Sequence, residues 1–224
     1  MFELFQIPAF RTLFTAQIIA LIGTGLTTIG LALLAFELAG NEASIVLGTA
    51  LAIKMVAYVF ISPAITGLIR HKHQKQYLIL FDFLRAIFVM LLFFVSSIWQ
   101  IYVLIFFLQA FSAGFTPIYQ SVISDILRDD RLFIKGASLS RIAYNLENIF
   151  SPTFAILLLT FINYSSFFIT NTICFFLSAV LILITNFPRA NTQKIEMNPI
   201  WQRAISGIAL FLNNRNLLAV LSLN

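Results

Sequence analysis

The feature that most constrains this chain is a series of six long apolar runs. A membrane-spanning helix needs about 20 apolar residues to cross ~30 Å of hydrocarbon with its backbone hydrogen bonds satisfied internally. Of the 224 residues, 60% are hydrophobic and 10% are charged, which leaves too little polar surface for a soluble protein. The sequence therefore predicts an all-α integral membrane protein, a six-transmembrane-helix bundle over residues 1–187 with spans at 10–38, 45–69, 77–95, 101–123, 137–162 and 165–187.

The distribution of Lys and Arg predicts the topology. The connectors after the first, third and fifth runs contain no Lys or Arg, whereas the other connectors are basic. Basic residues in short loops stay on the cytoplasmic side, so we expect a multi-pass protein of the inner (plasma) membrane with a cytoplasmic N-terminus. The net charge of +5 follows from this topology. Basic residues scattered between apolar helices do not form a nucleic-acid surface, and the predicted partner is the lipid bilayer.

The last part of the chain is more polar than the six runs. Residues 188–214 predict a cytoplasmic or interfacial linker. A further apolar stretch, LLAVLSL, begins at Leu217, and residues 215–224 predict the truncated start of a seventh helix.

Polar residues recur at helical spacing in the first, fourth and fifth runs, and the second run carries Lys54. Hydrocarbon would reject these side chains, so we expect them to face the interior of the bundle. The candidates for lining a substrate cavity are Gln17, Thr24, Thr28, Lys54, Gln109, Thr116, Gln120 and Asn148. An alternative holds for the first run: its threonines bond to their own helix, and its glycines serve only close packing.

Charged residues within the runs suggest coupling and gating roles. Glu147 lies roughly two turns inside its helix, where a carboxyl group is suited to carrying a proton unless a salt bridge to Lys54 keeps it ionised. Asp82 is the second candidate for proton coupling. Asp82 and Arg85 lie one turn apart, which predicts either an intrahelical ion pair or a gate against the connector between the second and third runs.

Two further expectations concern the connectors and the sixth run. The charged residues 124–136 predict a cytoplasmic connector between the fourth and fifth helices.

The sixth run is rich in Phe and carries few polar residues, among them Asn171 and Ser178, so we expect it to face lipid on the outside of the bundle. The lone Cys174 excludes an internal disulfide and is predicted to serve packing.

These features resemble the major facilitator superfamily, in particular the exporter branch that includes enterobactin and macrolide efflux proteins. The resemblance covers essentially the whole chain as the amino-terminal half of such a transporter. It rests on FRTLFTAQIIALIGTGLTTIGLALLAFELAG, LGTALAIKMVAYVFISPAITG and LILFDFLRA, and most specifically on FTPIYQSVISDILRDDRLFIKGASLSRIAYNLENIFSPTFAILLL. In the last segment the Thr-Pro pair, the charged connector and the Ser-Pro pair follow the order and spacing of the family.

The resemblance implies a secondary active transporter that exports an amphipathic small molecule, such as a drug or siderophore, by alternating access. Its substrate site would lie near the midplane between two halves, so the chain would pair with a second half-transporter or form a homodimer. The alternative is a truncated, transport-inactive remnant of such a transporter.

The resemblance also suggests a cytoplasmic gate in the connector between the second and third helices. Relatives carry Gly, then Asp, then basic residues in that loop, whereas here Gly67 is followed by LIRHKHQKQ and the Asp is missing. The gate candidates are Arg70, Lys72, Lys75 and Arg85. Other departures are the absence of an arginine in the fourth helix and Ser151-Pro152 in place of Gly-Pro.

Enzymatic chemistry is not predicted. His71 and His73 lie in a basic loop without acidic ligands nearby, and the sequence shows no nucleophile, base and orienting residue in a usable arrangement. We therefore predict no cofactor and no metal site.

Overall fold

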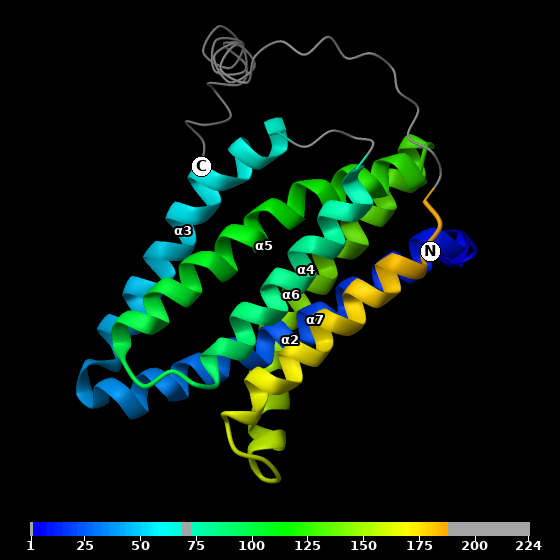
Figure 1. Ribbon diagram of the computed structural model, residues 1–224. Helices are drawn as coiled ribbons and strands as arrows, with labels where there is room; N and C mark the ends of the chain where they lie inside the picture. Colours follow the sequence, from blue (N-terminus) through cyan, green and yellow to red (C-terminus); the bar gives the residue numbers. More distant parts are fainter. Residues whose placement is uncertain (1, 69–72, 188–224) are drawn as a thin grey trace, which may run out of the picture. The chain divides into compact units, whose positions relative to one another are not determined.

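The computed structural model describes residues 2–68 and 73–187, and Figure 1 shows the helices they form. After a short helix α1 (Phe2–Phe5), the long helices are α2 (Pro8–Ala39), α3 (Ala43–Leu68), α4 (Gln74–Leu92), α5 (Ile98–Ile126), α6 (Asp130–Leu159) and α7 (Ser166–Ile184). A 3₁₀ turn, η1 (Gly40–Glu42), joins α2 to α3. The predicted all-α helical bundle is confirmed. The linker and the seventh helix predicted after residue 187 lie outside the described residues.

The helices are long and apolar enough for a membrane. Within the described ranges, the segments that could span a bilayer by length and composition are 8–62, Ile98–Ile126, Asp130–Leu159 and Ser166–Ile184. The first of these contains α2, η1 and most of α3. Helix α4 is not among them, and it carries Lys75, Asp82 and Arg85 within its 19 residues. That α4 is the third of the six spans, predicted at residues 77–95, therefore stays a prediction.

The predicted connector at residues 124–136 is wrong in its extent. Helix α5 continues to Ile126, and α6 already begins at Asp130. Asp129 caps α6, because its side-chain oxygen Oδ1 accepts a hydrogen bond from the Arg131 backbone N–H at 2.8 Å. A capped N-terminus makes the helix stable in water, so both helices extend past their apolar runs.

The packing of the helices places α7 against both α2 and α4, while α5 lies along α3 and α4. Helix α6 packs mainly on α2. One core cluster contains Phe10, Phe81, Phe115 and Ile182, and a second contains Val46, Val89, Ile101 and Phe175. Helix α6 contributes few buried side chains and is the helix whose packing leaves most of its surface free.

The prediction that the sixth run faces lipid is wrong for one face of α7. Asn171 and Ser178, seven residues apart on that face, are both buried. The Asn171 amide donates to the Thr27 hydroxyl at 2.7 Å, and the Ser178 hydroxyl donates to Asp82 at 2.7 Å. Polar groups within a membrane need partners, and these two find theirs on α2 and α4. Exposed Ile173 and Phe176 mark the opposite face of the helix.

Polar contacts also fix both ends of α7. At its C-terminal end the Lys75 ammonium donates to the carbonyl oxygens of Leu183 and Thr185, at 2.7 and 2.8 Å. Before its N-terminal end the Tyr164 hydroxyl donates to the carboxylate of Glu37. Burial, with the neighbouring carboxylate, raises the pKa of Tyr164 above its usual value, so the phenol remains a donor.

Candidate functional site

A group of polar side chains lies where α2, α3, α5 and α6 come together. Gln17 of α2 is buried and accepts a hydrogen bond from the Tyr119 hydroxyl of α5. Tyr58 of α3 lies within hydrogen-bonding reach of Thr116 of α5 and interacts electrostatically with Tyr144 of α6. Each of the four helices therefore contributes polar groups to this region, which we call the polar face.

Two buried atoms of the polar face make no regular hydrogen bond within the described residues. Nε2 of Gln17 on α2 has no hydrogen-bond partner within the described residues. Oγ of Ser140 on α6 makes no hydrogen bond of regular geometry there, although it lies within reach of the Tyr119 hydroxyl on α5. Buried polar atoms are almost always paired with protein or ordered water. Nε2 of Gln17 is therefore available to bound water or to a ligand group.

Lys54 and Glu147 are the ionisable side chains of opposite sign on the polar face. Both are half-buried. Lys54 lies on α3 roughly 16 Å along the axis from Ala43, at about 1.5 Å per residue, too deep for easy contact with water at the helix end. The two side chains interact electrostatically, but they are not among the close ion pairs that the described residues form. The salt bridge considered from the sequence is therefore a longer-range attraction in this structure.

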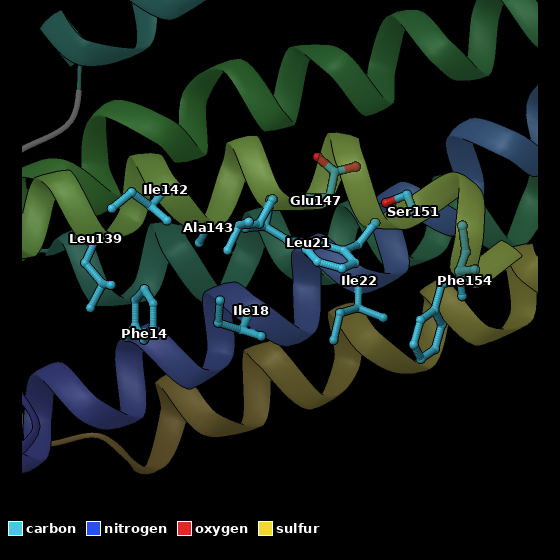
Figure 2. A pocket seen from close by; sticks show the side chains of 13 residues that line it. Phe14, Ile18, Leu21, Ile22, Leu139, Ile142, Ala143, Glu147, Ser151 and Phe154 are labelled. Atoms are coloured by element: carbon cyan, nitrogen blue, oxygen red, sulfur yellow. The ribbon is translucent and has the colours of Figure 1, made fainter.

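Gly25 of α2 determines how closely α6 approaches at Glu147. A Cβ atom added to Gly25 would collide with the Ser151 hydroxyl and would lie 3.0 Å from Oε1 of Glu147. Figure 2 shows the Glu147 carboxylate and the Ser151 hydroxyl close together on α6. Glycine at this position therefore leaves the space that these two polar groups occupy.

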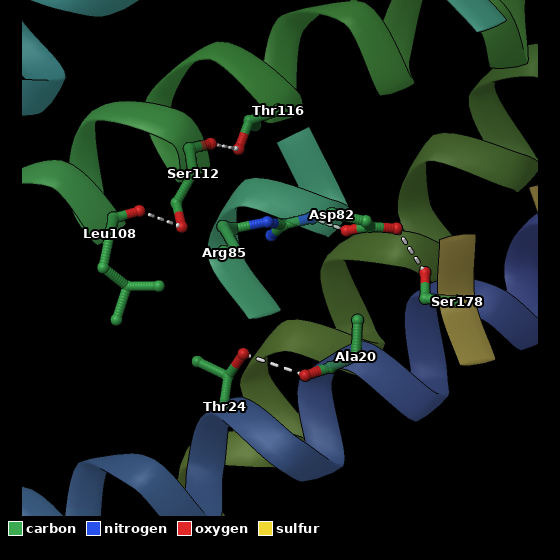
Figure 3. A network of polar contacts seen from close by, with 8 residues as sticks. All are labelled: Ala20, Thr24, Asp82, Arg85, Leu108, Ser112, Thr116 and Ser178. Carbon is green, nitrogen blue, oxygen red and sulfur yellow. Dashed lines mark hydrogen bonds and ion pairs between the residues drawn. The ribbon is translucent and has the colours of Figure 1, made fainter. Parts of the chain in front are cut away.

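Hydroxyl groups on α2 and α5 bond to their own helices. Thr24 donates to the Ala20 carbonyl at 2.8 Å and Thr28 to the Thr24 carbonyl at 3.1 Å. On α5, Thr116 donates to the Ser112 carbonyl at 3.1 Å (Figure 3). This is the local bonding considered as an alternative for the threonines of the first run, and it leaves the hydroxyl oxygens able to accept.

The remaining cavity candidates lie at different depths. Gln109 is half-buried, whereas Gln120 and Asn148 are exposed. The Asn148 amide donates to the Tyr144 carbonyl one turn earlier, at 3.0 Å. The structure therefore brings Gln17, Lys54, Thr116 and Glu147 to the four-helix polar face. The role of every candidate in the cavity stays a prediction.

Asp82 and Arg85 form a buried ion pair, shown in Figure 3. The second carboxylate oxygen of Asp82 accepts from Ser178, and the Arg85 guanidinium lies 4.1 Å and 4.5 Å from the ring centroids of Phe115 and Phe175. Of the two interpretations of this pair, the intrahelical contact is the one present. Because it joins α4 to α5 and α7, the pair holds together three helices.

The gate candidates are only partly described. Arg70 and Lys72 lie outside the described residues, so their contacts are not part of this structure. Lys75 binds the C-terminal carbonyl groups of α7, and Arg85 is paired with Asp82. A gating role for Lys75 or Arg85 would therefore have to break these contacts.

Sequence reasoning missed Tyr58 and Tyr119 of the polar face and the hydrogen bond between Asn171 and Thr27. Tyr58 and Tyr119 lie in apolar runs and were counted with the hydrophobic residues. Their phenol groups could have indicated a polar region, because a buried Tyr hydroxyl needs a hydrogen-bond partner. In the described part of the chain no group of three or more His, Cys, Asp or Glu residues is placed to hold a metal ion.

Comparison with known proteins identifies the family that the chain resembles. The family model described as the Major Facilitator Superfamily matches residues 13–224. Over 183 residues the chain is 28% identical to the uncharacterized MFS-type transporter YfiS of Bacillus subtilis (strain 168), an alignment that covers 78% of this chain and 43% of that protein. The chain thus spans less than half the length of this relative. No solved structure matches the chain.

Proposed function

Because the chain belongs to the major facilitator superfamily, a family of membrane transporters, we propose that it works as the amino-terminal half of an exporter of amphipathic small molecules. The polar face is the main structural support for this proposal. Four largely apolar helices place Gln17, Lys54, Thr116 and Glu147 in one region, where charged groups within a membrane typically serve a transport path. Alternating access around this region would move the substrate across the membrane.

A second set of helices would complete the path. The relative YfiS is more than twice as long as the segment matched here, and α3 and α6 expose large apolar side chains, including Phe60 at 71% and Ile149 at 67%. We propose that these faces pack against a second half-transporter or a second copy of the chain. The assembly would lie in the inner (plasma) membrane with its N-terminus in the cytoplasm.

Within the path, Glu147 is the group we propose as the proton carrier. Its carboxylate is half-buried beside Ser151 and lies within electrostatic range of Lys54. A change in charge at Glu147 would alter its attraction to Lys54, and so the electrostatic attraction between α3 and α6. Such coupling links protonation to a movement of helices.

Export of a lipophilic fluorescent cation tests this function. Cells that produce the protein in their membranes and cells that carry an empty vector are loaded with ethidium, and efflux is followed by fluorescence. We expect faster efflux and lower steady-state accumulation in the producing cells. Equal efflux, with the protein shown to be present in the membrane, would contradict the proposal and favour a chain without transport activity.

A further inference from the structure

A groove runs between α2 and α6 and holds a volume of about 350 Å³, within the range of roughly 300–1,000 Å³ typical of small-molecule sites. Thirteen side chains from these two helices line it (Figure 2). Eleven of them are apolar, among them Phe14, Leu21 and Phe154. A ligand in this groove would have most of its surface in contact with hydrocarbon side chains.

The two polar members of the lining are Glu147 and Ser151. Figure 2 shows them next to each other on α6, while Ile18 and Phe14 project from α2 further along the groove. Glu147 is the only ionisable side chain of the lining. The lining of the groove is thus apolar except for the Ser151 hydroxyl and one carboxylate. Such a lining complements a molecule that has an apolar body and a single positive charge.

The groove is also open toward the surface of the bundle. Ile22 is 49% exposed and Phe150 is 59% exposed, and both line it. In a membrane-embedded bundle, exposed apolar side chains that no second half covers meet lipid. An amphipathic molecule dissolved in the bilayer could therefore enter the groove sideways, without first crossing water.

We propose that the groove between α2 and α6 binds an amphipathic cation, with the apolar body of the ligand along the two helices and its charge at Glu147. The proposal rests on the transport function above, for which it names the substrate class and a site within a single half. Gly25 makes the site possible, since a Cβ at that position would displace Ser151 and crowd the Glu147 carboxylate.

A pair of probes with opposite charge tests the site. The full chain, purified into lipid nanodiscs, is titrated with tetraphenylphosphonium and with tetraphenylborate, two ions of the same shape. We expect the phosphonium to bind at least about tenfold more tightly to the protein than the borate does, relative to empty nanodiscs. Glu147→Gln should remove most of this difference, because it removes the charge and keeps the size of the side chain.

Two further variants separate the groove from other surfaces. Ile22→Trp should fill the groove and weaken the binding of both ions, and Gly25→Ala should weaken the phosphonium alone. Gly48→Ala on α3 is the matched control, because a Cβ there has no atom within 4 Å. Thermal melting of each variant tests whether it is folded. For the Glu147→Gln variant the measured quantity is the preference for the phosphonium over the borate, which does not depend on the overall affinity.

Two outcomes would overturn the site: phosphonium binding that Glu147→Gln and Ile22→Trp leave unchanged, or borate binding as tight as phosphonium binding. If ethidium efflux is present in either case, the transport function stands and this site is wrong. If binding follows the groove but efflux is absent, the site stands and the transport function is wrong.

Discussion

Replacing Glu147 by Gln should reduce efflux of a lipophilic cation at least about tenfold, the equivalent of losing ~1.4 kcal/mol of charge interaction at one step. The substitution keeps the volume of the side chain and removes both its charge and its ability to bind and release a proton. Glu147 lies beside Ser151, within electrostatic range of Lys54, so the path would lose a carboxylate that is attracted to a positive charge on another helix. The measurement is the initial rate of ethidium efflux, normalised to the protein in the membrane.

The matched control is Glu42→Gln. Glu42 is an exposed carboxylate in η1, outside the polar face, and its replacement should leave the efflux rate unchanged. Efflux at the normal rate in the Glu147→Gln variant would show that neither its charge nor its proton is needed. Equal loss in both variants would point to a general effect of charge on the membrane protein.

Replacing Asp82 by Ala should destabilise the bundle by about 3–5 kcal/mol, the usual cost of breaking a buried ion pair from one side. The Arg85 guanidinium would keep its charge between Phe115 and Phe175 without a counter-ion, and its Nε already has no partner within the described residues. We expect a lower melting temperature in detergent and less protein in the membrane.

A double variant separates this structural role from a role in proton coupling. Asp82→Leu combined with Arg85→Met replaces the pair with apolar groups and should recover most of the stability lost by the single variant. If the double variant is stable and still exports ethidium, Asp82 serves packing. If the Asp82→Ala variant is as stable as the unsubstituted protein, the ion pair does not stabilise the packing of α4 against α5 and α7.

The helices were predictable because length and apolarity alone require them in a membrane. Their ends were not, since helices can extend into a charged segment such as 124–136: α5 continues to Ile126, and α6 starts at Asp130 because Asp129 caps it. The face of α7 was also misjudged. Asn171 and Ser178 share one side of that helix, and their spacing alone indicated a buried stripe.

The candidate site was predictable residue by residue but not in its contacts. Spacing along one helix identifies a polar stripe, as for Gln17 and Thr116, because both lie in otherwise apolar runs. It does not show which helices meet, so the pairing of Gln17 with Tyr119 and the approach of Glu147 to Gly25 appear only in three dimensions. Lys75 illustrates the same point, since its two carbonyl partners lie more than 100 residues away in the sequence.

We expect the polar face to line a path that opens in turn to each side of the membrane, and the accessibility of this face to water tests that expectation. The native Cys174 is replaced by Ala, and single cysteines are then placed at Thr116 on the polar face or at Phe176, an exposed position on α7. A membrane-impermeant thiol reagent is applied from the cytoplasmic side or from the outer side. The account predicts labelling at position 116 from both sides and at position 176 from neither. Labelling at position 116 from one side only, or from neither, would contradict it.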